Sequence, residues 1–201
     1  MDFLQRTFER TRQEKRAAIV GYITAGDPDV ERSFEIIDAA CANGLDVLEL
    51  GIPFSDPMAD GVVIQKASGR AIKAGMTLAK GLEIVRELRK RHDLPIILFS
   101  YFNPIFIFGV EKFVREALGA GVDGVLVVDL PAENAAELMQ HVIPKPVWAV
   151  GFAHEQPLRD VTLACSASGI SKQLGHNHNN SNNDVTKNAE ITTSPRGQFH
   201  F

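Results

Sequence analysis

This sequence contains few cysteines and has a small net charge. Cys41 and Cys165 are the only cysteines among 201 residues, too few for a disulfide framework or a zinc site. Cys41 falls on the apolar side of a helical pattern, which predicts a small buried side chain. The formal net charge is only −4 at pH 7, so the composition points neither to nucleic acid nor to an anionic membrane as a partner.

Long apolar runs are missing as well. No stretch approaches the roughly 18 apolar residues of a membrane span. The N-terminus, which begins MDFLQR, carries charges at close intervals and has no apolar segment of signal-peptide length. We therefore expect a soluble, cytoplasmic protein. Its 45% hydrophobic and 23% charged residues are ordinary for a globular chain with one sizeable core.

Apolar, β-branched runs alternate with helical patterns over most of the chain. The runs predict strands at residues 17–25, 46–50, 96–100, 124–128 and 147–152. The helical spacing of apolar residues predicts helices at 2–15, 30–43, 62–73, 78–88, 110–118 and 133–142. Phe3, Leu4 and Phe8 form the apolar side of the first helix, and Asp27 and Thr77 are candidate caps. This order favours an α/β fold with helical crossovers between parallel strands.

A short segment of the chain occurs in two similar copies. Residues 43–48, NGLDVL, resemble residues 120–125, AGVDGV. In each copy a helix ends on glycine and an aspartate, Asp46 or Asp123, opens the next strand. This repeat favours a (β/α)-repeat architecture.

The strand at 46–50 carries a carboxylate among apolar residues. Glu49 lies between Leu48 and Leu50, where an acid is costly unless it is paired, protonated or used. The loop that follows holds Asp56 and Asp60, and active sites of parallel α/β proteins are built on such loops. Two simpler interpretations remain open. Glu49 could form a structural ion pair with a lysine or arginine, and Asp60 could cap the helix that starts at Val62.

The composition changes near residue 166. Residues 166–201 are rich in serine and asparagine and show neither strand nor helix periodicity, which predicts a disordered tail. His176 and His178 belong to this polar tract, and without other ligands nearby we expect no metal site there.

Four segments carry a family resemblance. Residues 48–61, LELGIPFSDPMADG, followed by Val63-Ile64-Gln65, closely resemble the signature of the tryptophan synthase α subunit. Residues 22–28, 101–104 and 128–131 resemble other segments of that family, and the match extends over about residues 1–143. The resemblance implies a (β/α)8 or TIM barrel and a lyase of tryptophan biosynthesis, which cleaves indole-3-glycerol phosphate to indole and glyceraldehyde 3-phosphate. It also implies an α2β2 complex with a β subunit that carries pyridoxal phosphate, and no cofactor in this chain.

The resemblance also implies roles for individual residues. Glu49 would be the general acid/base, and Asp60 would face the indole N–H. Five residues near strand ends would line the indole pocket: Tyr22, Thr24, Tyr101, Leu126 and Val128. Four loop residues would face the β subunit: Pro53, Asp56, Asn103 and Pro131. For Leu126 and Val128 the alternative is barrel core, and for the prolines and Asn103 it is turn formation.

The implied reaction explains these residue types. Separating indole from the glycerol chain requires a proton at ring carbon C3, and the protonated ring carries positive charge at nitrogen. A carboxylate beside that nitrogen, Asp60, would stabilise the charge. A buried acid with a raised pKa, Glu49, would donate the proton and then accept one from the glycerol hydroxyl.

The sequence departs from the family in two places. Val62 stands where the family commonly has proline. Beyond about residue 143 the match is lost, and a full barrel needs about 250 residues. We expect only the first five β/α units, with a partial barrel at 1–152, a divergent segment at 153–165 and the tail at 166–201, as in a truncated or frameshifted member.

This departure affects the expected function. The loops after the seventh and eighth strands of a TIM barrel usually bind the substrate phosphate. Without them, we expect little or no lyase activity from the isolated chain. The alternative function is therefore an inactive remnant that still binds a β-type subunit. A different phosphosugar barrel enzyme is a third hypothesis, which the motif from Glu49 to Asp60 disfavours.

Overall fold

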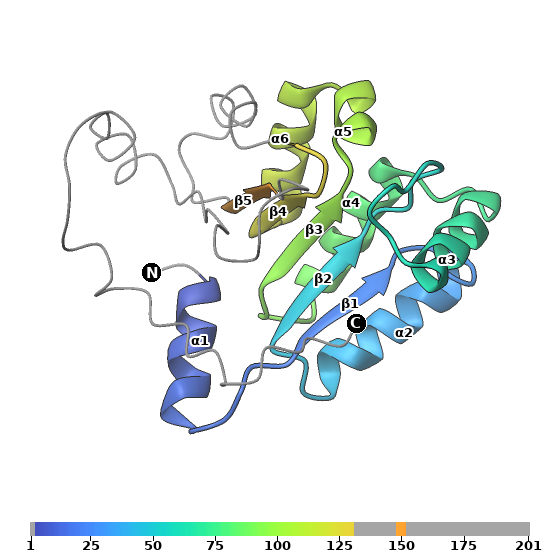
Figure 1. Ribbon diagram of the computed structural model, residues 1–201. Coiled ribbons are helices and arrows are strands. Elements are labelled where there is room, and N and C mark those ends of the chain that lie inside the picture. The colour runs from blue at the N-terminus through green and yellow to red at the C-terminus, as the bar shows by residue number, and fades with distance from the viewer. Residues whose placement is uncertain (1–2, 131–147, 152–201) are drawn as a thin grey trace, which may run out of the picture. The chain divides into compact units, whose positions relative to one another are not determined.

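The computed structural model describes residues 3–130 and 148–151 (Figure 1). The predicted helix at 133–142, the tail at 166–201 and Pro131 lie outside the described residues. The helices are α1 (Phe3–Gln13), α2 (Val30–Ala42), α3 (Val62–Lys73), α4 (Leu78–Arg89), α5 (Phe102–Phe108) and α6 (Val110–Ala120). The strands are β1 (Val20–Thr24), β2 (Val47–Gly51), β3 (Ile96–Ser100), β4 (Gly124–Val127) and β5 (Trp148–Gly151). None of the helices described is both long and apolar enough to span a membrane.

The five strands form one parallel sheet in the order of the chain, β1-β2-β3-β4-β5. Helices connect the first four strands, as parallel pairing of consecutive strands requires. The predicted α/β fold with parallel strands is therefore confirmed. One row of the register runs from Tyr22 through Glu49 and Ile97 to Gly124. Because paired residues point to the same side of a sheet, this row places the Tyr22 and Glu49 side chains on one face.

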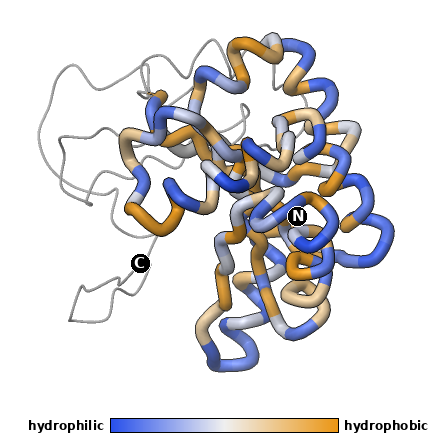
Figure 2. The backbone as a smooth tube through the Cα atoms, turned by 90° about the vertical axis from the view of Figure 1, so that its right-hand side faces the viewer, coloured by the Kyte–Doolittle hydropathy of each residue, from blue (hydrophilic) through white to orange (hydrophobic). Residues whose placement is uncertain are grey.

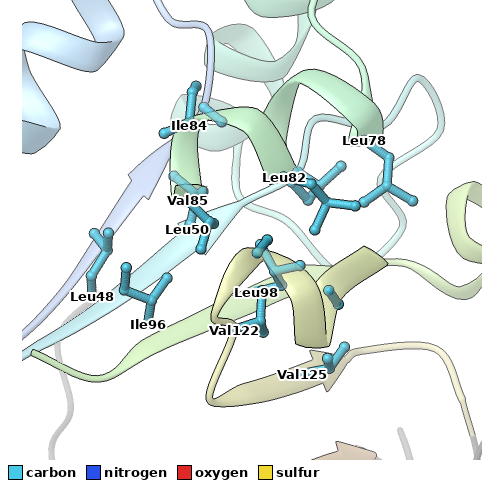
Figure 3. Close-up of a cluster of buried hydrophobic side chains, with 14 of the residues drawn as sticks. Leu48, Leu50, Leu78, Leu82, Ile84, Val85, Ile96, Leu98, Val122 and Val125 are labelled. Atoms are coloured by element: carbon cyan, nitrogen blue, oxygen red, sulfur yellow. The ribbon is translucent and has the colours of Figure 1, made fainter. Parts of the chain in front are cut away.

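The other face of the sheet packs against helices and forms the core. Leu48, Leu50, Ile96 and Leu98 alternate with the residues of that row and are fully buried. Figure 3 shows Leu82 and Val85 of α4 gathered with Leu50 and Leu98. Burying such a side chain stabilises the fold by roughly 1.5–3 kcal/mol. Hydrophobic and hydrophilic stretches alternate along the helices (Figure 2), as expected for helices that cover one face of a sheet.

The face with Tyr22 and Glu49 is less completely covered. Ile97, Phe99 and Leu126 lie on this face by register and are only half-buried. The sheet thus has one closed apolar face and one half-exposed face of mixed character.

The two similar segments form equivalent contacts at the start of the sheet. The Asp46 carboxylate accepts a hydrogen bond from the backbone N–H of Ile19 at 2.9 Å, next to β1. The Asp123 carboxylate accepts one from the N–H of Ile96 at 2.9 Å, at the start of β3. Each aspartate therefore connects two neighbouring strands: Asp46 connects β2 to β1, and Asp123 connects β4 to β3. Arginines complete both sites: Arg10 and Arg16 pair with Asp46, and Arg89 pairs with Asp123.

Two helix predictions are wrong in detail. Phe8 was expected on the apolar side of α1 but is 45% exposed, whereas Thr7 and Thr11 are buried. Asp29 caps α2 by accepting from the N–H of Arg32, while Asp27 pairs with Arg70 at 2.6 Å. The first helical turn thus begins two residues later than the Asp27 cap implied.

Two further differences lie at strand ends. The expected loop position of Asn103 is wrong, because α5 starts at Phe102, with Pro104 in its first turn, where proline is tolerated. Strand β4 ends at Val127, so Val128 follows the strand; its N–H donates to the Ser100 carbonyl at 3.1 Å. Other bounds agree closely, and α3 and β3 begin and end where predicted.

Candidate active site

Glu49 is a half-buried acid for which the described residues supply no ion-pair partner. It lies in β2 between Leu48 and Leu50, which are fully buried. No ion pair joins Glu49 to a lysine or arginine within the described residues. Burial raises the pKa of Glu49 because the charged form loses hydration. The predicted alternative of a structural ion pair is therefore absent from the part of the chain that the structure describes.

Tyr22 lies beside Glu49 and reaches across the sheet. Tyr22 and Glu49 are register partners on β1 and β2. The Tyr22 ring meets the Phe99 ring of β3 edge-on, with 5.2 Å between the centroids and 81° between the planes. Gly51 of β2 lies between them, and a Cβ there would collide with the Tyr22 phenol. The contact between β1 and β3 aromatics thus depends on a glycine in the strand between.

Several polar groups act on the Tyr22 hydroxyl. Burial raises the pKa of Tyr22, a hydrogen bond with Thr24 lowers it, and the charges of Asp60 and Glu49 raise it. Thr24 itself is buried at the end of β1. Both carboxylates therefore lie close enough to the Tyr22 phenol to interact with it electrostatically.

Asp60 lies on the loop between β2 and α3 and is more buried than its neighbours. Asp60 is half-buried, whereas Ala59 and Gly61 are exposed and Met58 is 83% exposed. The N-cap of α3 is Gly61, without any side-chain cap bond, so the predicted capping role of Asp60 is wrong. Burial raises the pKa of Asp60, and a hydrogen bond with Tyr101 acts in the opposite direction.

Tyr101 links this loop to the end of β3. It is 3% exposed, and its hydroxyl accepts a hydrogen bond from the N–H of Ala59 at 2.9 Å. The Tyr101 ring packs on Phe54, with 5.0 Å between centroids. Burial raises the pKa of Tyr101, and the Asp60 charge also raises it. Tyr22, Glu49, Asp60 and Tyr101 therefore form one cluster of titratable groups.

The remaining predicted site residues lie in different surroundings. Leu126 is half-buried on the same face as Glu49, whereas Val128 is buried just past β4. Asp56 and Asn103 are exposed, as a surface for a partner requires. Pro53, expected to face a partner, is instead buried between the strand end and the loop.

Sequence reasoning missed three residues that shape the cluster: Gly51, Phe54 and Phe99. Phe99 could have been found from strand alternation, because it lies two residues after Ile97 and therefore shares its face. The need for glycine at 51 depends on the course of the Tyr22 ring, which no local pattern contains. Among the described residues, no group of three or more His, Cys, Asp or Glu side chains could hold a metal ion.

The cluster combines features of a proton-transfer site. Two carboxyl groups with raised pKa lie beside two phenols, at the carboxyl ends of parallel strands where active sites of this architecture are found. A raised pKa brings each acid closer to the pH at which it can both donate and accept a proton. Three half-buried apolar side chains, Ile97, Phe99 and Leu126, lie on the same face.

Comparisons with known proteins give one consistent result. A family model described as "Tryptophan synthase alpha chain" matches residues 8–156. Tryptophan synthase alpha chains of Desulfatibacillum aliphaticivorans and Geotalea daltonii are 54% and 52% identical over 138 and 137 residues. These matches cover 69% and 68% of this chain and 52% of each relative, so the chain spans about half the length of the curated relatives it matches.

Solved structures give the same picture. Tryptophan synthase subunit alpha from Legionella pneumophila str. Paris superposes with a TM-score of 0.68 at 38% identity, covering 74% of this chain and 57% of that one. A tryptophan synthase complex from Pyrococcus furiosus gives a TM-score of 0.64 at 41% identity, covering 70% and 58%. The likeness thus extends over the described β/α units and part of each neighbour.

Proposed function

This chain belongs to the tryptophan synthase alpha chain family, and we propose that it carries the acid/base residues of that family's lyase reaction. The reaction is cleavage of indole-3-glycerol phosphate to indole and glyceraldehyde 3-phosphate. The described β/α units of this chain correspond to part of the family's TIM barrel. The observation that carries the proposal is Glu49: a half-buried acid with a raised pKa, no cation beside it within the described residues, and Asp60 in the same cluster.

Glu49 is the proposed general acid and base. In its protonated form it donates a proton to C3 of the indole ring. Once ionised, it accepts the proton of the glycerol hydroxyl as the carbon–carbon bond breaks and the aldehyde forms. Burial supports this cycle because it keeps the pKa of Glu49 above that of a solvated glutamate.

Asp60 is the proposed partner of the indole nitrogen. Protonation at C3 places positive charge on that nitrogen, and a nearby carboxylate stabilises the charge more strongly in a partly water-excluded site. Tyr22, Thr24 and Leu126 are proposed to contact the indole ring from the half-exposed face of the sheet. This cleavage needs only proton transfers, so the proposal assigns no cofactor to this chain.

A β-type subunit with pyridoxal phosphate is the proposed partner, in an α2β2 complex. Asp56 is exposed on the loop after β2 and Asn103 in the first turn of α5, at the same end of the sheet as the acid cluster, which supports a docking surface there. This exposure also favours a second candidate function, in which the chain binds a β-type subunit without turnover. The proposal assigns no residue to the substrate phosphate.

One experiment separates the two functions. Indole release from indole-3-glycerol phosphate is measured for the full chain, alone and with a β subunit, and binding is measured on the same samples. The matched variants are Glu49→Gln and Asp60→Asn, which keep side-chain shape and remove the acid. Turnover that both variants reduce by about a hundredfold or more supports the lyase. Binding without any turnover favours the second function, and turnover that both variants retain contradicts the assignment of the two acids.

A further inference from the structure

We propose that Tyr101 is a positioning residue for Asp60: its hydroxyl fastens the exposed β2–α3 loop to the end of β3 and thereby fixes the Asp60 carboxylate. The family resemblance implies a different role for Tyr101, as a residue that lines the indole pocket. The catalytic meaning of this inference rests on the proposed lyase function, but the link itself is a property of the folded chain.

The loop has few other constraints near Asp60. Ser55, Asp56, Met58, Ala59 and Gly61 are all exposed. Exposed loop segments without packing sample many conformations. Asp60 is nevertheless half-buried, so specific contacts must hold it.

Tyr101 supplies the main contact from a rigid element. The residue directly follows β3, is 3% exposed, and packs its ring on Phe54 at 5.0 Å. A buried ring at a strand end presents its hydroxyl with little freedom. That hydroxyl accepts the N–H of Ala59 at 2.9 Å, across 42 residues of sequence.

The chemistry of a phenol suits this position. A tyrosine hydroxyl has one proton to donate and lone pairs to accept. Since the Tyr101 oxygen accepts from the N–H of Ala59, its proton is available for the carboxylate of the next residue, Asp60. The hydrogen bond between Tyr101 and Asp60 lowers the pKa of Asp60, against the effect of burial. One hydroxyl thus orders both the backbone and the side chain at this point.

A second contact, from helix α3, holds the backbone on the other side of Asp60. Gln65 of α3 donates its side-chain N–H to the Asp60 carbonyl at 2.8 Å. The backbone around Asp60 is therefore fixed on one side by β3 through Tyr101 and on the other by α3 through Gln65. Only the Tyr101 contact also reaches the carboxylate.

The test compares Tyr101→Phe with Tyr22→Phe. Both variants remove one phenol hydroxyl from the same cluster and keep the ring, but Tyr22 bonds to Thr24 and has no described contact with the loop backbone. Glu49 on β2 is unchanged in both variants, and so is Asp129 after β4, whose charge also acts on Tyr101. Nuclear magnetic resonance of carboxyl-labelled protein measures the pKa of Asp60, and hydrogen exchange measures the protection of the Ala59 amide.

We expect the pKa of Asp60 to rise in Tyr101→Phe, because burial remains while the hydrogen bond is lost. The Ala59 amide should exchange roughly tenfold faster, the effect of one lost hydrogen bond. Tyr22→Phe should alter neither quantity. A folded Tyr101→Phe protein with unchanged Asp60 pKa and unchanged Ala59 exchange would overturn the inference, as would equal effects in Tyr22→Phe.

Two further measurements complete the test. If Tyr101→Phe does not fold, the unmodified chain decides: its Ala59 amide should exchange roughly tenfold more slowly than the Ser55 amide, and equal rates would contradict the link. If the unmodified chain turns over substrate, Tyr101→Phe should lower kcat on the order of tenfold or more, with a smaller change in KM. Absence of turnover would count against the lyase alone, since the Asp60 measurements do not depend on activity.

Discussion

At the scale of single residues, Glu49 lowers the stability of the fold but suits the proposed proton transfer. Its sequence context alone, an acid between two leucines, predicted an unusual environment, and the structure adds that no cation offsets it within the described residues. The raised pKa that suits proton transfer means that ionised Glu49 is less stable in the folded chain than in water. Function and stability therefore favour different residues at this position.

Glu49→Gln should consequently stabilise the chain at pH 7. A group whose folded pKa is raised contributes full stability below its unfolded pKa, about 4.3 for glutamate, and loses it as pH rises through the folded value. Glutamine has no charge to bury, so we expect the free energy of unfolding to rise by up to about 1 kcal/mol. The partial hydration of Glu49 limits this gain. Urea unfolding at pH 7 and pH 4 measures it. A gain that does not shrink at pH 4 would contradict this cause.

Gly51 is the second residue with a specific structural requirement. In Gly51→Ala the new methyl group would collide with the Tyr22 phenol, so either Tyr22 leaves Phe99 or the strands shift. We expect the free energy of unfolding of Gly51→Ala to fall by about 1–3 kcal/mol. The control is Gly69→Ala in α3, where a Cβ meets open space and alanine should add about 0.5–1 kcal/mol. Denaturant unfolding of both variants decides, and equal effects would refute the steric argument.

A feature of a single residue could be predicted from the sequence where it depends on neighbouring residues in the chain. The conflict at Glu49 lies within three consecutive residues and was visible in the sequence. The hydrogen bond from the Ala59 N–H to the Tyr101 hydroxyl joins residues 42 positions apart, and no periodicity contains it. Asp60 was misjudged as a possible cap because the choice between Asp60 and Gly61 depends on backbone angles, and Gly61 adopts the extended N-cap conformation.

At the scale of elements, the aspartate that precedes a strand in both similar segments has a structural explanation. Sequence similarity between residues 43–48 and 120–125 indicated a repeated unit, and in both copies the aspartate bonds to the backbone N–H at the start of the preceding strand. Such contacts at the amino ends of parallel strands contribute to stability, whereas the carboxyl ends carry the chemistry.

Asp46→Asn should therefore destabilise the chain without altering the acid cluster. The Asp46 side chain is 3% exposed and contacts Arg10 and Arg16, and hydrogen bonds from Arg16 hold the pKa of Asp46 well below its usual range. A depressed pKa contributes stability that is complete above the unfolded value of about 3.9 and is lost as pH falls below it. We expect a loss of about 1–3 kcal/mol at pH 7.

Urea unfolding of Asp46→Asn across pH 7 to pH 2 measures this effect. The difference from the unmodified chain should narrow below about pH 4, because Asp46 then binds a proton in the unfolded chain but not in the folded one, which lowers the free energy of unfolding of the unmodified chain. A difference that stays constant down to pH 2 would show that shape, and not charge, makes Asp46 important.

Elements themselves were predictable where their signals were unambiguous. Strand β3 follows Pro95 and consists of four apolar residues and Ser100, and its bounds were predicted correctly. Helix α5 was missed because Pro104 and an aromatic run resemble a turn, although proline fits the first turn of a helix. In α1, threonines replace Phe8 on the buried side, since tertiary contacts override amphipathic pattern in a short helix.

At the scale of the whole molecule, the order of the strands brings the site together. Because consecutive strands are neighbours in one parallel sheet, the loops after β2 and β3 lie at the same end, and residues near 22, 49, 60 and 101 meet there. The sequence predicted this assembly through alternation of strands and helices. The exposure of Asp56 and Asn103 at that end, beside the acid cluster, makes it the surface on which a partner would affect catalysis.

A charge reversal tests that surface directly. If a β-type subunit docks at this end, Asp56→Lys should weaken its binding by about tenfold or more, since like charges or unpaired charges at an interface cost several kcal/mol. Glu83→Lys on α4 is the matched control, because Glu83 is also exposed and lies outside the loops that follow the strands. Binding measured by titration calorimetry should be unchanged for Glu83→Lys. Equal weakening by both variants would indicate a general charge effect, and unaltered binding of Asp56→Lys would place the partner on another surface.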